Sequence, residues 1–277
     1  MKHAAGTLSG LSVHSGSRAL RPAHPQHSLE LAYEFSASEY SEPLVMEQTG
    51  TMQGLWLSYR HGAPLRSSVL RALLTNLEAS YRRGDVHYDG QLTDGTAYEI
   101  DDIPSHVLEA RITLGVLRQA TPGMGLAPYI GFGYRYRRDD SGHDPAGYER
   151  ETRYYYLPIG MQLTHGVARG WWLVSVAEYD LFLRGRQSTH LSDVDPRFAD
   201  FENRQSGGSG ARGGLTLWKN AGGVAFLLGP FVRYWQVDES GVATPGGAYA
   251  RVAEPQNRSV EIGARVGLRA GAGAERR

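Results

Sequence analysis

Alternation of apolar and polar residues over segments of ten or more residues is the feature that most constrains the fold of this chain. In the clearest segment, apolar residues alternate with charged residues or glycine in the order Val260, Glu261, Ile262, Gly263, Ala264, Arg265, Val266, Gly267, Leu268 and Arg269. A period of two is typical of a β-strand with two different faces. The chain is therefore expected to be built from strands that face two different environments.

Ten segments carry this pattern or a blurred form of it. They lie near residues 28–40, 47–60, 69–82, 107–118, 125–137, 153–163, 171–183, 205–218, 224–237 and 260–269. Their length matches the roughly 9–11 residues that a tilted strand needs to cross a bilayer, whereas strands of soluble proteins typically have about five or six residues. No apolar run approaches the roughly 18 residues of a membrane helix, which excludes a helical membrane protein.

The connections between these segments alternate in length. Short connections lie near 61–67, 119–124, 164–170 and 219–223, and long ones near 41–46, 83–106, 138–152, 184–204 and 238–258, the first of these being the shortest. Bacterial outer-membrane barrels have short periplasmic turns and long extracellular loops. We therefore predict an all-β, transmembrane, up-and-down antiparallel β-barrel of about 10 strands, with 8 or 12 as alternatives. Residues 28–269 form the barrel, 1–27 a flexible extension and 270–277 a tail.

The composition of the chain argues against several classes of function. The 29 basic and 29 acidic residues balance, which argues against a nucleic-acid partner. The absence of cysteine excludes disulfides, zinc–thiolate sites and thiol nucleophiles. Residues 1–10 lack the apolar core of a secretion signal, so we expect any such signal to have been removed. We expect no cofactor and no metal.

The polar faces of the strands carry charges of both signs, which would be costly in an apolar core. We expect these residues to line the lumen: Glu30, Glu34, Glu109, Arg111, Arg135, Glu178, Asp180, Arg233, Glu261 and Arg265. The same faces carry Arg60, Glu78, Arg82, Arg212 and Arg269. Small barrels are filled by their own side chains, and open channels have about sixteen strands. An interior ion-pair network that plugs the barrel is therefore expected.

Aromatic residues lie near the strand ends, as in the two girdles of membrane barrels. The girdle expected beside the long loops comprises Tyr81, Tyr134, Tyr136, Tyr154, Tyr155, Tyr156, Tyr234 and Trp235, and the one beside the short turns comprises Tyr59, Trp171, Trp172 and Trp218. The glycines within 207–214 are expected to make room for bulky neighbours such as Arg212 or Trp235.

Several motifs resemble those of a known group of proteins. They are the segments 154–160 (YYYLPIG), 178–180 (EYD) leading to Ser192 and Asp193, 230–235 (PFVRYW), and Glu254-Pro255 before 260–263 (VEIG). From Ser28 to Leu268 the chain resembles the small outer-membrane β-barrel proteins of Gram-negative bacteria, opacity-like in general architecture. The resemblance implies an outer-membrane location and no catalytic residue to transfer.

The loop residues could supply two kinds of catalytic group. A barrel protease would use loop histidines with nearby aspartates, and the candidates are His87, His106, His143 and His190 with Asp85, Asp89, Asp101, Asp102, Asp139, Asp140, Asp193 and Asp195. A lipid esterase would combine His190 with Asp193 and either Ser188 or Ser192. None of these groups has motif spacing, and solvated loops commonly contain such residues, so we expect no catalytic residue.

The sequence therefore favours a non-enzymatic outer-membrane barrel whose loops contact the exterior or an envelope protein, because recognition often resides in loops on a rigid scaffold. Expected partners are outer-membrane lipid and lipopolysaccharide. Three alternatives remain: a narrow channel for small solutes or ions, a surface enzyme, and a soluble calycin-like barrel. The soluble barrel would direct apolar residues inward and charged residues outward.

Overall fold

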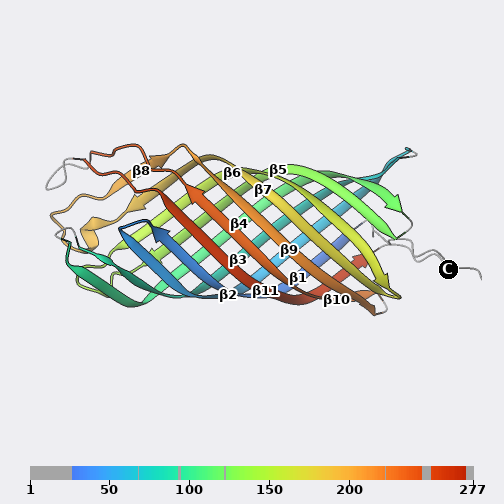
Figure 1. Cartoon of the computed structure of the whole chain (residues 1–277), viewed down its shortest axis with the longest axis horizontal. Coiled ribbons are helices and arrows are strands. Elements are labelled where there is room, and N and C mark those ends of the chain that lie inside the picture. Colours follow the sequence, from blue (N-terminus) through green and yellow to red (C-terminus); the bar gives the residue numbers. More distant parts are fainter. Residues whose placement is uncertain are drawn as a thin grey trace, which may run out of the picture.

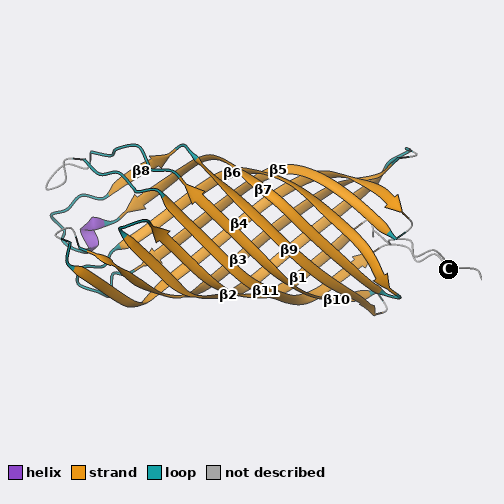
Figure 2. Ribbon diagram, viewed as in Figure 1, coloured by secondary structure: helices purple, strands orange, loops and turns teal. Residues whose placement is uncertain are grey.

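A computed structural model describes residues 27–67, 69–92, 95–121, 123–221, 223–244 and 251–272. It is built almost entirely of strands (Figures 1 and 2). The strands are β1 (His27–Glu42), β2 (Met46–Pro64), β3 (Leu70–Gln91), β4 (Ala97–Thr121), β5 (Met124–Asp140), β6 (Glu149–Ala168), β7 (Trp171–Thr189), β8 (Phe201–Gln205), β9 (Gly208–Ala221), β10 (Val224–Val237) and β11 (Asn257–Ala272). A short 3-10 helix, η1 (Leu191–Asp193), precedes β8.

The strands close into one antiparallel barrel. Consecutive strands pair from β1 to β7, β7 pairs with β9, and β9, β10 and β11 continue the sheet. The sheet closes where β11 pairs with β1, with Leu31 opposite Leu268. Strand β8 pairs with the loop-side end of β7, beyond β9. The predicted up-and-down antiparallel barrel of ten strands is therefore confirmed, with β8 as one additional short strand.

Each of the ten predicted segments overlaps a strand of the barrel, and several strands are longer than predicted. The segment 205–218 begins too early, because Gln205 is the last residue of β8 and β9 begins at Gly208. The segment 83–106 was expected to be a loop, and this expectation is wrong: β3 and β4 continue to Gln91 and from Ala97. Likewise β8 lies inside the expected loop 184–204. The expected terminal extension and tail fall outside the described residues, except for His27 and 270–272.

Within the described residues, no helix is long and apolar enough to cross a membrane.

Apolar side chains cover the outside of the barrel. Leu29, Ile112, Val266 and Leu268 are between 42% and 56% exposed, whereas Glu109 on the opposite face is 4% exposed. The soluble calycin-like alternative requires the reverse orientation, so this orientation excludes it. An apolar exterior around a polar interior is the arrangement of transmembrane barrels. The long loops and the short turns lie at opposite ends of the barrel (Figure 1).

Only part of the expected aromatic girdles faces outward. Tyr59 and Tyr81 are exposed at opposite ends of the barrel. Five of the expected girdle residues instead point into the barrel and are buried, so their assignment was wrong: Tyr154, Tyr156, Trp172, Trp218 and Trp235. The reason is the alternation itself, because adjacent residues such as Trp171 and Trp172 point to opposite faces of a strand. These inward rings belong to two separate clusters of buried residues inside the barrel.

Candidate functional site in the barrel lumen

Inward-facing charged side chains fill the middle of the barrel. Within the described chain the inward basic residues are all arginines, namely Arg60, Arg82, Arg111, Arg135, Arg137, Arg150, Arg212, Arg233, Arg265 and Arg269. Inward acidic residues match them in number: Glu30, Glu34, Glu42, Glu78, Glu109, Asp139, Glu178, Asp180, Glu254 and Glu261. The lumen therefore balances its own charge, as burial of so many ions requires.

One half of this network is centred on Glu34 and Arg82, neither of which is exposed. The carboxylate of Glu34 accepts hydrogen bonds from Arg233 at 2.9 and 3.1 Å and from Arg265 at 2.9 Å. The Arg82 guanidinium lies 3.1 Å from Glu261 and 3.6 Å from Glu34. Opposite charges thus alternate across strands β1, β3, β10 and β11.

The other half is centred on Arg212 of β9. Its guanidinium lies 2.6 Å from Glu109, 2.6 Å from Glu178 and 2.9 Å from Asp180. Arg111 joins the same group at 2.5 Å from Glu178 and also contacts Glu78. Because β4 and β9 are not neighbours in the sheet, the contact between Arg212 and Glu109 crosses the lumen. Such bonds fill the interior and tie opposite walls together.

The structure brings together most of the residues expected to line the lumen. Eight lie in the two groups described above: Glu34, Glu109, Arg111, Glu178, Asp180, Arg233, Glu261 and Arg265. Glu30 lies apart, 3.5 Å from Arg269 toward the short turns. Arg135 is buried beside the network, with no carboxylate at ion-pair distance among the described residues. Arg82 and Arg212, absent from that expected set, are central, although the alternation had placed both on the charged face.

An aromatic cluster closes the lumen on the loop side of the network. It consists of Tyr154, Tyr156, Phe182, Trp235 and Val237. The rings of Tyr156 and Trp235 meet edge to face, with centroids 5.0 Å apart. Tyr156 also donates a hydrogen bond to Glu109. A Cβ on Gly210 would lie 2.9 Å from the Trp235 ring, which confirms that this glycine makes room for the ring.

A second cluster lies toward the short turns. It consists of Ala32, Trp56, Trp172, Val174, Trp218 and Leu227. Two arginines cover its rings: the Arg265 guanidinium carbon lies 3.8 Å from the centre of the Trp56 ring, and that of Arg269 lies 3.9 Å from the centre of the Trp218 ring. Cation–π contacts of this kind stabilise buried guanidinium groups. The charged network is thus bounded at both ends by aromatic rings.

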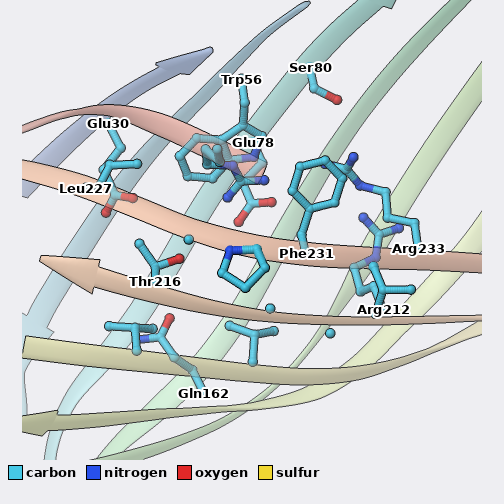
Figure 3. A pocket seen from close by; sticks show the side chains of 18 of the residues that line it. Glu30, Trp56, Glu78, Ser80, Gln162, Arg212, Thr216, Leu227, Phe231 and Arg233 are labelled. Atoms are coloured by element: carbon cyan, nitrogen blue, oxygen red, sulfur yellow. The ribbon is translucent and has the colours of Figure 1, made fainter. Parts of the chain in front are cut away.

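A cavity of about 110 Å³ lies between the network and the second cluster. Figure 3 shows side chains from several strands around it, including Trp56, Glu78, Arg212, Phe231 and Arg233. The cavity is lined by both charged groups and aromatic rings. It has room for only a few water molecules or a small ion.

The loop between β10 and β11 is tied to the loop-side mouth of the barrel through Glu254. Arg150 lies 2.5 Å from Glu42 and also pairs with Glu254. Burial raises the pKa of Glu254 to about 7, with Glu42 adding to the rise and Arg150 opposing it. The backbone of Glu254 exchanges hydrogen bonds with Ser240. These contacts hold the loop against the barrel.

The loop histidines do not assemble either of the two alternative catalytic groups. His190 faces Asp200 at 3.3 Å, and Asp193 accepts a hydrogen bond from the backbone N–H of Glu149. His87 lies 2.7 Å from Asp101. In the described part of the chain, no serine hydroxyl is hydrogen-bonded to a histidine ring, and no group of three or more His, Asp or Glu side chains is arranged to hold a metal ion.

The chain is a transmembrane barrel of the bacterial outer membrane, because an apolar surface faces outward all round a charged interior and short turns and long loops lie at opposite ends.

Comparison with known proteins finds similar folds among outer-membrane barrels. No family model and no curated protein matches the chain. The translocator domain of the autotransporter NalP from Neisseria meningitidis is 12% identical to this chain. The alignment covers 91% of this chain and 90% of that domain, and its TM-score is 0.41. The toluene transporter TodX of Pseudomonas putida is 10% identical, with coverage of 92% and 93% and a TM-score of 0.36. The attachment invasion locus protein Ail of Yersinia pestis, in complex with a heparin analogue, is 10% identical, with coverage of 88% and 99% and a TM-score of 0.34. Similarity at this level carries no function to this chain.

Proposed function

We propose that this protein is a non-enzymatic outer-membrane barrel with a plugged lumen, which serves as a rigid support for extracellular hairpins and loops that contact an external or envelope partner. The observation that carries the proposal is the filling of the lumen by ion pairs between two aromatic clusters. A barrel plugged in this way is suited to holding recognition elements in place.

The plug leaves little space for solutes. Trp235 and Tyr156 are at most 2% exposed and lie on the loop side of the ion-pair network. The charged groups of the network form ion pairs with groups on other strands, so moving one would leave its partners buried with less compensation. The lumen is therefore a packed interior.

The loop side of the barrel is braced as well. The first residues of β4, at its loop-side end, contact the loop between β5 and β6 in two places. Tyr98 donates a hydrogen bond to Asp144 at 2.6 Å, and His143 lies 3.1 Å from the carbonyl oxygen of Asp101. Beyond the apolar belt β3 and β4 both carry exposed charged residues, such as Asp85 of β3 and Asp101 of β4. This polar, braced projection is the surface that we expect a partner to contact.

Conductance across planar bilayers tests the plug. The wild-type barrel is expected to give no stable unit conductance, whereas the double variant Tyr156→Ala/Trp235→Ala is expected to leak because it removes the loop-side cluster. Leu228→Ala, a change on the lipid-facing surface, is the matched control and is expected to remain silent.

The cavity beside the network favours one second candidate, a narrow channel for small ions. Stable wild-type conductance that changes with Glu178→Gln would establish the channel and overturn the plugged barrel. Hydrolysis of lipid or peptide substrates by the wild type that is lost in His106→Ala or His190→Ala would overturn the non-enzymatic assignment.

A further inference from the structure

Three arginines lie directly opposite one another on the outer surface of three neighbouring strands. In the register of the sheet, Arg153 of β6 faces Arg186 of β7, and Arg186 faces Arg204 of β8. Residues opposite each other in antiparallel strands point to the same side, and like charges in that position are destabilising. A bound anion would relieve the repulsion between these like charges.

A fourth arginine joins the row through a β-bulge. The register between β6 and β7 shifts at Tyr155 and Tyr156, so that Leu183 is an extra residue and Arg184 faces Tyr155. Bulges commonly redirect side chains in this way. The Arg184 guanidinium consequently lies outside, 4.7 Å from the centre of the Tyr155 ring. We call Arg153, Arg184, Arg186 and Arg204 the arginine row.

Nearby acids neutralise only half of this charge. Arg153 pairs with Glu151 on its own strand, and Arg186 lies 3.3 Å from Glu202. Arg184 and Arg204 are exposed and have no carboxylate at ion-pair distance within the described residues. Their N–H groups are free to bind an anion.

The arginine row lies at the loop-side edge of the lipid-facing belt. On β7 the exposed apolar residues Tyr179, Leu181 and Leu183 lead directly to Arg184 and Arg186. Tyrosine rings such as that of Tyr155 prefer the headgroup level of a membrane. An anionic group bound here would lie at the headgroup level of the membrane. The acyl chains of the same lipid would cover the adjoining Leu181 and Leu183.

We propose that the arginine row binds the phosphorylated headgroup of an anionic lipid in the outer leaflet, which in this membrane is lipopolysaccharide. The planar guanidinium group matches phosphate oxygens in a bidentate manner. Four such groups at the edge of an apolar surface present cations to the phosphates while the belt binds the acyl chains. The proposal rests on the membrane placement of the barrel and is independent of the plugged lumen.

Binding of the detergent-solubilised, folded barrel to lipopolysaccharide tests the proposal. The wild type is expected to bind intact lipopolysaccharide at least about ten-fold more tightly than phosphatase-treated lipopolysaccharide, because removing the phosphates removes their charge-assisted hydrogen bonds with the guanidinium groups. The double variant Arg186→Gln/Arg204→Gln is expected to lose this preference. Arg118→Gln, which removes an exposed arginine near the short-turn end of β4, is the matched control and is expected to retain it.

Two further measurements keep the test decisive. The double variant is expected to unfold at the same or a higher urea concentration than the wild type in phosphate-free detergent, because it removes like-charge repulsion; this shows that it folds. Inorganic phosphate is expected to compete weakly. Full competition by millimolar phosphate, or equal binding of treated and intact lipopolysaccharide by the wild type, would overturn the lipid site.

Discussion

Arg233 of β10 donates hydrogen bonds to both carboxylate oxygens of Glu34 on β1, at 2.9 and 3.1 Å. Strand β11 lies between these two strands, so the bond joins elements that do not pair in the sheet. Glu34 also accepts from Arg265 on β11 itself. One carboxylate therefore links three successive strands at the seam where the barrel closes.

Replacing Glu34 by glutamine is expected to destabilise the barrel strongly. The change leaves Arg82, Arg233 and Arg265 with less compensation in a buried site, at a cost of about 3–5 kcal/mol. Urea unfolding in lipid vesicles measures the difference. Glu39→Gln is the control, because the Glu39 side chain is 42% exposed and 3.5 Å from Arg258, so its loss is expected to cost no more than about 1 kcal/mol. Equal losses in the two variants would contradict the ion-pair account.

The loop-side aromatic cluster depends on a glycine beneath it. A Cβ on Gly133 would lie 2.1 Å from the Tyr156 ring, so Gly133→Ala is expected to displace the ring and cost about 1–3 kcal/mol. At Gly213 the nearest atom to an added Cβ is 3.5 Å away, so Gly213→Ala is the matched control and is expected to be nearly neutral. Thermal unfolding in detergent compares them, and a neutral Gly133→Ala would show that the cluster is loosely packed.

An arginine placed on the lipid-facing belt is expected to oppose insertion. Ile262 is 61% exposed on the outside of β11, within the lipid-facing belt, and Ile262→Arg is expected to cost about 2–4 kcal/mol. Thr49→Arg, on the exposed face of β2 beyond the belt, is expected to cost about 1 kcal/mol or less. Folding yields into phosphatidylcholine vesicles measure both, and equal yields would place Ile262 outside the hydrocarbon.

Closure of the loop between β10 and β11 is expected to weaken as pH rises. Burial raises the pKa of Glu254 to about 7, whereas an unfolded glutamate titrates near 4.3. The folded state therefore binds the proton more tightly, and the contribution to stability is greatest at low pH and is lost as pH rises through about 7. The titratable or charged groups around it are Tyr40, Glu42, Tyr148 and Arg150.

Hydrogen exchange at residues 238–244 and 251–256 measures this closure. After correction for the intrinsic exchange rate, protection is expected to be greater at pH 5.5 than at pH 8 in the wild type. Glu254→Gln, which stays neutral at both values, is expected to remove the difference. An unchanged pH dependence in this variant would assign the effect to another group.

The strands and their two faces were predictable from the sequence because each membrane-spanning residue meets either lipid or the lumen. Segments such as 108–116 and 260–269 therefore keep a strict alternation. Where β3 and β4 extend past the belt, the outer face meets water instead of lipid and carries polar residues, and only the small cluster of Val86, Ile100 and Ile103 is apolar and buried. The apolar face that identifies a membrane-spanning strand is therefore missing from this part of the sequence. The expected loop 83–106 was wrong for this reason.

The partners of each charged residue were not predictable in the same way. Alternation places Glu109 and Arg212 on the inner face, but it does not say which strands oppose each other across the lumen. Their contact depends on the closure of the barrel and on the room that small residues leave. The inward turn of Trp172 and Trp235 follows from the same alternation, whereas their position near strand ends favours a girdle.

All inward basic residues in the described part of the barrel are arginines. A guanidinium group stays protonated in proteins at any ordinary pH, whereas a buried ammonium group loses its proton readily. The sequence has lysine only at positions 2 and 219, and Lys219 lies over the Trp171 ring next to a short turn. Alkaline conditions and amine-acylating reagents that would dismantle a lysine-based interior therefore leave the basic half of this one intact.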